Sequence, residues 1–248
     1  MPRDERDTRL YTFDLAPGRV IGNKYVVESR LGGGWEGEVY RVNERRTGAR
    51  RAAKLFFPQR NERDKAVDFY AKKLEQLRGC PIVIEYHHQE TLRYKGAPVS
   101  VLISEYVEGT ILSKFIAGRP GKRLPEFEAL HVLYGLAAGL EQIHTRRDYH
   151  GDIHAGNVLI QRRGVHFDVK LVDLFNLGRP TAANIREDVV QSIKLFYDML
   201  GGQRWYQAQR QEVKWLICGL KRSMIAKRFP TARHLREHLD TFQWFAND

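Results

Sequence analysis

The sequence predicts an α+β fold, with strands in the first hundred residues and helices in the remainder. Apolar and polar residues alternate over 25–31 and 38–42, as in half-buried strands, and a third strand is expected over 50–56. Helical spacing dominates 125–143 and 188–200. A run of strands followed by a run of helices is typical of α+β proteins.

Length and composition suit one two-lobed unit or two small domains. The 248 residues are 42% hydrophobic and 11% aromatic, enough to bury a large core. Cys80 and Cys218 lack metal-ligand spacing and are expected to be reduced core residues. The N-terminus is charged, and no apolar run approaches the roughly 18 residues of a membrane span. We therefore expect a cytoplasmic protein that does not contact a membrane.

The net charge of +11, from 41 Lys and Arg against 30 Asp and Glu, favours polyanionic partners. The charge is dispersed, however, and acidic residues interrupt most basic stretches. No basic run is interleaved with aromatic residues, the pattern of a nucleic-acid groove. Nucleic acid is therefore not expected as the main partner.

The first twenty residues lack periodicity and are expected to form an N-terminal arm. The next two strands flank a glycine-rich turn over 32–37. A dinucleotide-binding turn opens a helix, whereas this turn leads into a strand, which favours a flap that covers phosphate groups. Gly32, Gly34 and Gly37 would let the backbone approach phosphate oxygens.

Lys54 lies among apolar residues of the third strand. Burial of an unpaired ammonium group is costly, so a partner for it is expected. The alternative is a side chain that reaches solvent from the strand edge. The glycine-rich turn upstream favours the first interpretation.

A helix is expected over 61–78, followed by strands over 82–84 and 98–103 that flank a turn at 94–96. The apolar face of this helix would consist of Val67, Tyr70, Leu74 and Leu77. A longer helix follows Pro125. Its apolar stripe would consist of Phe127, Leu130, Tyr134, Ala137, Leu140 and Ile143.

The longer helix leads to a loop, His150-Gly151-Asp152-Ile153-His154-Ala155-Gly156-Asn157, that runs into an apolar strand. A second apolar run, 169–172, ends at Asp173, and a turn over 161–168 separates the two strands. Each strand would present an oxygen ligand at one end. Mg²⁺ takes few protein oxygens and fills its other positions with phosphate and water. Asn157 and Asp173 therefore form a candidate metal site, and Asp152 remains for proton transfer.

The order of these motifs resembles the protein kinases. The family template has H-R-D with an asparagine five residues after the aspartate, and then D-F-G. Here H-G-D precedes Asn157 at that spacing, and the later motif reads Asp173-Leu174-Phe175. Gly151 replaces the arginine, and Phe175 replaces the last glycine. The H-G-D form also resembles small-molecule kinases such as the aminoglycoside and choline kinases.

The resemblance covers residues 25 to about 242 and implies a bilobal protein kinase-like fold. Residues 1–20 would be an arm, 21–104 an N-lobe with a small antiparallel sheet, 105–109 a hinge, and 110–248 a helical C-lobe. ATP and Mg²⁺ would bind between the lobes.

The resemblance also implies site residues for transfer of the γ-phosphoryl group of ATP to a hydroxyl. Asp152 would accept the hydroxyl proton and Lys54 would hold the phosphates. Asn157 would serve the catalytic loop and, with Asp173, the metal. The nucleotide would be bound by Gly32, Gly34, Gly37, Val39, Ala52, Lys54, Glu105, Val107 and Leu159.

Several positions depart from the family pattern. Tyr70 occupies the place of the helix glutamate that pairs with the strand lysine, and the replacement acids considered are Asp68, Glu75 and Glu62.

A helix that begins at Asp188 resembles the one whose aspartate supports the catalytic loop. No A-P-E motif follows, so Arg228, in an R-P-T-A-like stretch, lacks its usual partner. His154 would touch the γ-phosphate or stabilise the loop.

Three functions compete. The complete flap and the R-P-T-A-like stretch favour a Ser/Thr protein kinase. The H-G-D motif and the short segment after Asp173 favour a small-molecule kinase, and Tyr70 with the altered D-L-F favours a nucleotide-binding pseudokinase that acts as an interaction module. The phosphoacceptor would be a protein or a small molecule. Gly151 has no side chain to form a charge-assisted bond with a phosphate, and Thr181 is the only hydroxyl residue of 174–187. Control by loop phosphorylation is therefore not expected, and regulation would fall to a protein partner that seats the helix around Tyr70, or to none.

Overall fold

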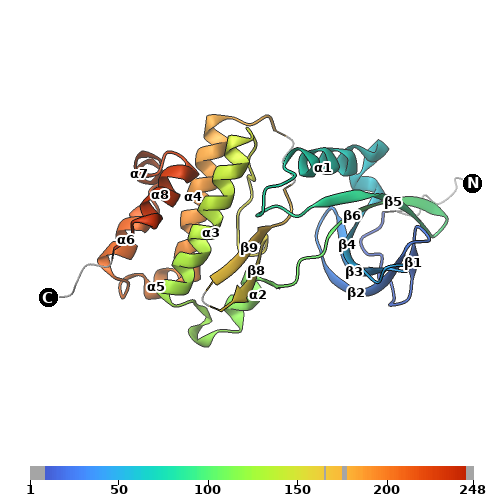
Figure 1. Cartoon of the computed structure of the whole chain (residues 1–248), viewed down its shortest axis with the longest axis horizontal. Coiled ribbons are helices and arrows are strands. Elements are labelled where there is room, and N and C mark those ends of the chain that lie inside the picture. Colours follow the sequence, from blue (N-terminus) through green and yellow to red (C-terminus); the bar gives the residue numbers. More distant parts are fainter. Residues whose placement is uncertain (1–8, 165, 175–177, 244–248) are drawn as a thin grey trace, which may run out of the picture. The chain divides into compact units, whose positions relative to one another are not determined.

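The computed structural model describes residues 9–164, 166–174 and 178–243. The chain forms two compact units. The first comprises residues up to Arg78 together with Ile84–Val107, and the second comprises Gly79–Val83 together with residues from Glu108 onward. The first unit is rich in strands and the second is mostly helical (Figure 1), which confirms the predicted α+β class.

A six-stranded antiparallel sheet forms the first unit, in the order β1-β2-β3-β4-β6-β5. Its strands are β1 (Val20–Ile21), β2 (Tyr25–Gly33), β3 (Gly37–Glu44), β4 (Arg50–Phe56), β5 (Tyr86–Tyr94) and β6 (Ala97–Glu105). The glycine-rich turn joins β2 to β3, as predicted.

The strand predicted over 82–84 is wrong, because this apolar run is buried by packing and lies outside the sheet. Val83 forms an isolated bridge to Leu171, and Leu171 N donates to Ile82 O over 2.6 Å. Ile82 also lies against Gly139 in the second unit. A short apolar run signals burial, which a loop achieves as well as a strand does.

One face of the sheet carries the core of the first unit. Tyr40 and Val42 of β3 and Leu55 of β4 are fully buried there. The segment before β1, which has no periodicity, adds Phe13, whose ring stacks on Phe57 at a centroid distance of 5.1 Å. The lead-in segment is thus part of this core.

Helix α1 (Lys65–Gln76) packs against β5 and β6. It follows two short 3₁₀ turns, η1 (Pro58–Arg60) and η2 (Glu62–Asp64), so it begins later than predicted. The Asn61 side chain explains the start, because its Oδ1 accepts from Ala66 N at 3.1 Å and Val67 N at 3.0 Å. The predicted apolar face of Val67, Tyr70, Leu74 and Leu77 is buried.

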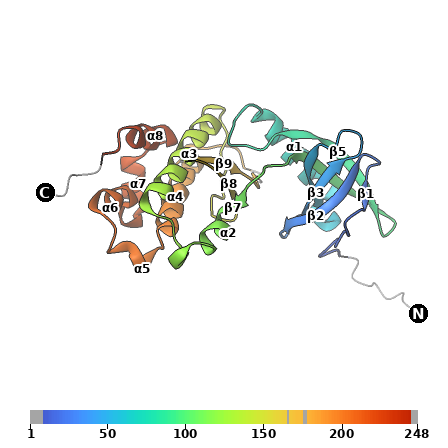
Figure 2. The same cartoon turned by 60° about the horizontal axis from the view of Figure 1, so that its bottom comes forward.

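The second unit combines a three-stranded sheet with helices (Figure 2). Its strands are β7 (Thr110–Ile111), β8 (Val158–Arg163) and β9 (His166–Leu171). Its helices are α2 (Leu112–Ala117), α3 (Glu126–Thr145), α4 (Ala182–Met199), α5 (Gln203–Tyr206), α6 (Gln211–Ile217), α7 (Arg222–Arg228) and α8 (Ala232–Asp240), with 3₁₀ turns η3 (Pro120–Lys122) and η4 (Cys218–Leu220). Helix α3 contacts α4, α8 and β9.

Two helix predictions need correction. Phe127 and Tyr134, placed on the buried stripe of α3, are exposed, because a helix packed on several sides has no single apolar stripe. Helix α4 begins at Ala182 rather than Asp188. Thr181 caps it, accepting from Asn184 N at 3.2 Å, while Asn184 Oδ1 accepts from Thr181 N at 3.0 Å.

The remaining predictions about the fold concern one turn, the cysteines, Arg228 and membrane spans. The turn predicted over 161–168 is shorter, because β8 and β9 extend into it. Cys80 and Cys218 are buried and free, as expected. Arg228 lies over the Trp215 ring, 3.7 Å from its centroid. No helix in the described part of the chain has the length and apolarity needed to cross a membrane.

A buried carboxylate, Glu38, joins the lead-in segment to β3. It accepts hydrogen bonds from Thr12 Oγ1 at 2.8 Å, from Phe13 N at 3.1 Å and from the Tyr40 hydroxyl. Burial alone would raise the pKa of Glu38, but these bonds and the nearby Arg30 guanidinium outweigh it and lower the pKa below 4.5. Burial and the bond to Glu38 raise the pKa of Tyr40 to about 12.

These shifts predict how stability depends on pH. A lowered folded-state pKa means that Glu38 contributes stability above its usual value of 4.5, and this contribution is lost as the pH falls through the folded-state value. A raised pKa means that Tyr40 contributes stability below pH 10 that is lost as the pH rises toward about 12.

Replacing Glu38 by Gln should therefore cost about 1–3 kcal/mol of unfolding free energy near neutral pH, because the buried bonds lose their charged acceptor. The deficit relative to wild type should shrink in acid, as measured by urea unfolding across a pH series. Glu62→Gln, at an exposed glutamate of the same unit, is the control and should follow wild type. A deficit that stays constant with pH would contradict this account.

Candidate active site

The loop before β8 is fixed by one fully buried carboxylate, Asp188 of α4. Its Oδ2 accepts from His150 N at 2.8 Å and its Oδ1 from Gly151 N at 2.7 Å. His144 Nε2, on α3, lies 3.0 Å from the same Oδ2. The predicted support of this loop by Asp188 is confirmed. Gly151 has a φ of +83°, a conformation that glycine adopts without strain.

The His150 side chain links the loop to the segment that leads to Asp173. Its Nδ1 accepts from Asp152 N at 3.2 Å, so the neutral ring bears its proton on Nε2 and donates it to Val172 O at 3.0 Å. The buried imidazole therefore ties the backbone of Asp152 to the residue that precedes Asp173.

Sequence reasoning missed Gln191 of α4. Its Oε1 accepts from Ile153 N at 2.7 Å, and its Nε2 donates to Gly151 O at 3.3 Å. Gln191 follows Asp188 by three positions, so both side chains lie on one face of the helix. That spacing is the signal that would have identified it.

Asp152 is presented to solvent by this fixed loop. Its side chain is 70% exposed, whereas its neighbour in the site, Asn157, is buried. Asn157 Nδ2 donates to Asp152 O at 2.9 Å and to Asp152 Oδ2 at 3.2 Å, which orients the carboxylate. This geometry is suited to a general base that must meet a substrate hydroxyl.

His154 makes contacts within the loop. Its Nδ1 accepts from Gly156 N at 3.0 Å, and its Nε2 lies 3.6 Å from Asp152 Oδ2. Of the two roles considered for His154, these contacts support stabilisation of the loop.

Strand register brings the two candidate metal ligands to one end of the sheet. Strands β8 and β9 are antiparallel, with Val158 opposite Leu171, and Val172 N donates to Asn157 O at 3.0 Å. Asn157 therefore precedes β8 at the end where Asp173 follows β9. Asp173 has a φ of +60°, which is uncommon outside glycine and is often found at functional sites. Phe175 lies outside the described residues.

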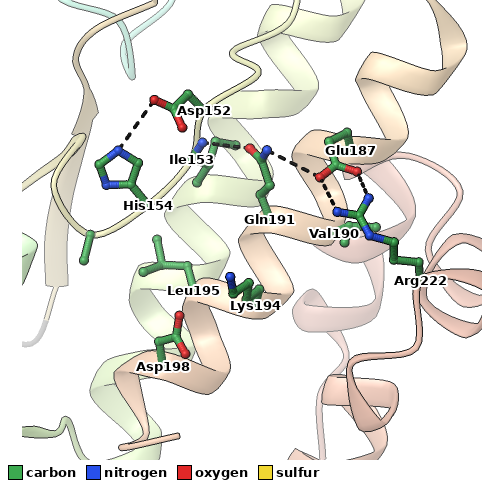
Figure 3. A pocket seen from close by; sticks show the side chains of 11 residues that line it. Asp152, Ile153, His154, Glu187, Val190, Gln191, Lys194, Leu195, Asp198 and Arg222 are labelled. Atoms are coloured by element: carbon green, nitrogen blue, oxygen red, sulfur yellow. Dashed lines mark hydrogen bonds and ion pairs between the residues drawn. The ribbon is translucent and has the colours of Figure 1, made fainter. Parts of the chain in front are cut away.

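A cavity of about 290 Å³ adjoins Asp152 (Figure 3). The catalytic-loop side is formed by Asp152, Ile153, His154 and Ala155, and the remaining lining includes Glu187, Val190, Gln191, Lys194, Leu195, Asp198 and Arg222. The Arg222 guanidinium and the Glu187 carboxylate form an ion pair at its edge. The cavity therefore lies directly beside the Asp152 carboxylate.

Predicted nucleotide-binding residues of β2, β3 and β4 lie on one face of the first unit's sheet. Val39 lies opposite both Gly32 and Lys54, and Gly37 lies opposite Phe56. Ala52 lies two residues before Lys54, so it shares this face. A Cβ at Gly32 or Gly34 would meet no atom within 4 Å, so packing does not require glycine there. Open space over the turn is suited to a phosphate group.

The remaining predicted nucleotide residues lie elsewhere. Glu105 ends β6, where its N donates to Glu85 O at 2.8 Å, and Val107 is the last residue of the first unit. Leu159 is half-buried in β8 of the second unit, opposite Lys170.

Lys54 is buried and has a carboxylate partner that sequence reasoning missed. Its Nζ lies 2.8 Å from Glu36 Oε2, within the glycine-rich turn. Asp68 instead contacts Gln89 at 3.2 Å, Glu75 pairs with Arg78 at 2.6 Å, and Glu62 is exposed. The three replacement acids considered from the sequence are therefore wrong. The strand-edge alternative for Lys54 is also wrong, because the residue is 8% exposed.

Comparison of the sequence with known proteins finds protein kinases. A model of the protein kinase domain matches residues 25–230. Myosin-IIIb of Mus musculus is 29% identical over 162 residues, which are 64% of this chain and 12% of that protein. Serine/threonine-protein kinases PknA of Corynebacterium glutamicum is 28% identical over 167 residues, 66% of this chain and 34% of that protein. The chain spans less than two thirds of the length of either relative.

The fold agrees with that match. The crystal structure of the PknI kinase domain of Mycobacterium tuberculosis superposes with a TM-score of 0.65 at 22% identity, and the match covers 91% of this chain and 98% of that one.

The contacts of Asp188 predict a large effect on stability. Asp188→Asn removes the charge and turns an amide toward backbone donors, which should cost about 2–5 kcal/mol of unfolding free energy. Urea unfolding measures the cost, and hydrogen exchange at His150 and Gly151 locates it. Asp168→Asn is the control, because the Asp168–Arg163 pair is 56% and 68% exposed and should contribute at most about 1 kcal/mol. Equal stability of the two variants would contradict the assignment.

Proposed function

Because this chain belongs to the protein kinase family, we propose that it transfers the γ-phosphoryl group of ATP to serine or threonine hydroxyls of proteins, with Mg²⁺ bound. The observation that carries the proposal is the exposed Asp152 carboxylate on a loop fixed by Asp188, His150 and Asn157. Such a fixed carboxylate supplies the positioning on which phosphoryl transfer depends.

In the proposed reaction the acceptor hydroxyl enters the cavity beside Asp152 and donates its proton to the carboxylate. The hydroxyl oxygen then attacks the γ-phosphorus, the bond to the bridging β–γ oxygen breaks, and ADP leaves. The products are a phosphate ester, ADP and a proton. Lys54 would hold the nucleotide phosphates against the glycine-rich turn.

Asn157 and Asp173 have the chemistry of a magnesium site. Asn157 Nδ2 is bonded to Asp152, which leaves its amide oxygen as the ligand atom, and Asp173 offers a carboxylate at the same end of the sheet. Bound Mg²⁺ would neutralise charge on the phosphates. No group of three or more His, Cys, Asp or Glu residues suited to a metal occurs in the described ranges, so the proposed ligand set relies on substrate oxygens and water.

The rival functions are disfavoured by different observations. The family match favours a protein acceptor over a small molecule. The fixed catalytic loop favours catalysis over a pseudokinase role.

Control by loop phosphorylation is also disfavoured, because Thr181 already caps α4. A regulatory protein partner stays part of the proposal. Since Tyr70 is 2% exposed, such a partner would act on the outer face of α1.

Nucleotide binding is the first test. Mg-ATP at about 100 times its dissociation constant should stabilise the protein by about 2.7 kcal/mol, measured as a thermal shift. Lys54→Met should reduce the shift, because it removes the phosphate contact, and Asp173→Ala should reduce its dependence on Mg²⁺. The absence of any shift in folded wild-type protein at millimolar Mg-ATP would refute the proposal.

Catalysis is tested separately from binding. Asp152→Ala should lower kcat by about 10²–10⁴, the usual contribution of a general base, and leave the Kd of Mg-ATP nearly unchanged. Radiolabel transfer to generic protein substrates, followed by phosphoamino acid analysis, measures the rate and the acceptor, and a panel of hydroxylated metabolites tests the small-molecule alternative. Asp168→Asn should behave as wild type. Wild-type turnover by Asp152→Ala would exclude it as the base.

A further inference from the structure

Lys54 is held by an acid from the turn that leads into the neighbouring strand, β3. The Glu36 side chain is 10% exposed and that of Lys54 is 11% exposed, with 2.8 Å between Oε2 and Nζ. A buried ammonium group is stable only when paired, and this carboxylate supplies the charge. The acid belongs to the turn predicted to cover the phosphates.

The backbone around Glu36 is fixed to the strand that carries Lys54. Phe57 N donates to Glu36 O at 2.8 Å, and Gly34 N donates to Gly37 O at 2.9 Å. A Cβ at Gly37 would collide with Leu55 O, so only glycine permits this close approach of β3 to β4. These backbone contacts place Glu36 beside Lys54.

Helix α1 presents an aromatic ring to the same ammonium group. Lys54 Nζ lies 4.6 Å from the ring centroid of Tyr70 and 5.3 Å from that of Phe56. The rings attract the cation through their π faces and confine it. Neither ring carries a carboxylate, and the acidic group beside Nζ is that of Glu36 in the turn.

We propose that Glu36 is the positioning residue for Lys54, a role that depends on the proposed function. Glu36 holds Nζ on the sheet face shared with Gly32, Val39 and Ala52. An ammonium group has three donors, so Nζ can bond to Glu36 and to phosphate oxygens at the same time. The glycine-rich turn thus both covers the nucleotide and orients the lysine that binds it.

The first experiment tests the pair in nucleotide-free protein. Glu36→Gln, Lys54→Met and the double variant form a double-mutant cycle, read by urea unfolding. The second substitution should cost clearly less stability than it does alone, since the first already removes the contact. Additive effects would overturn the proposal.

The second experiment measures Mg-ATP affinity and steady-state kinetics. Glu36→Gln should weaken nucleotide binding and lower kcat/KM by about tenfold or more, because a charge-assisted bond is lost. Glu36→Asp, which keeps the charge, should recover part of both. Glu62→Gln is the matched control, an exposed glutamate of the same unit, and should leave both unchanged.

Each alternative outcome has a distinct reading. If Glu36→Gln bound Mg-ATP more tightly than wild type, Glu36 would be a latch that competes with the phosphates, and the positioning role would be wrong. If Glu36→Gln matched Glu62→Gln, the pair would be structural only and the proposal would fail. Failure of wild-type protein to bind Mg-ATP would instead overturn the proposed function, and this role with it.

Discussion

The buried carboxylate of Asp188 is the constraint on which the geometry of the second unit depends. A charge with no exposure to water must be satisfied completely, and two backbone N–H groups of the catalytic loop and one imidazole satisfy it. The loop therefore takes its position from α4, the helix packed between other elements of the unit. His150 connects this loop to the end of β9, because its Nε2 donates to the carbonyl oxygen of Val172, the residue that follows the strand.

The two candidate catalytic charges have opposite surroundings. The Asp152 carboxylate is exposed, while the backbone of its loop is held in place. The Lys54 ammonium group is buried, lies 2.8 Å from Glu36 and faces two aromatic rings. An exposed carboxylate keeps its water when it moves, whereas a buried ammonium group without its partner would lack both water and a counter-charge.

The sequence predicted most of what local pattern can encode. The strand that carries Lys54 was predicted at its observed bounds, 50–56, because apolar residues follow a turn there. Asp152, Asn157 and Asp173 were identified by spacing, and strand register places the last two at one end of a sheet.

Two of the failures share a cause. The run at 82–84 is buried by a loop contact, and the exposed face of α3 is set by which neighbours cover it. Both features depend on residues far away in the sequence, so the local periodicity of the sequence could not predict them. Glu36 was missed for a different reason: the search for a partner of Lys54 was confined to the helix where the family places one. Gln191 was visible as a spacing on one helix face but carries no motif.

The pairing of Glu36 with Lys54 spans only 18 residues, from the turn before β3 to β4, the next strand in sequence and in the sheet. A contact of such short range needs little loop closure and can form with its hairpin, before distant segments arrive. A partner on α1 would have left the lysine without a counter-charge until that helix docked. Because Glu36 directly precedes β3, the counter-charge of Lys54 is local in the chain and lies outside α1.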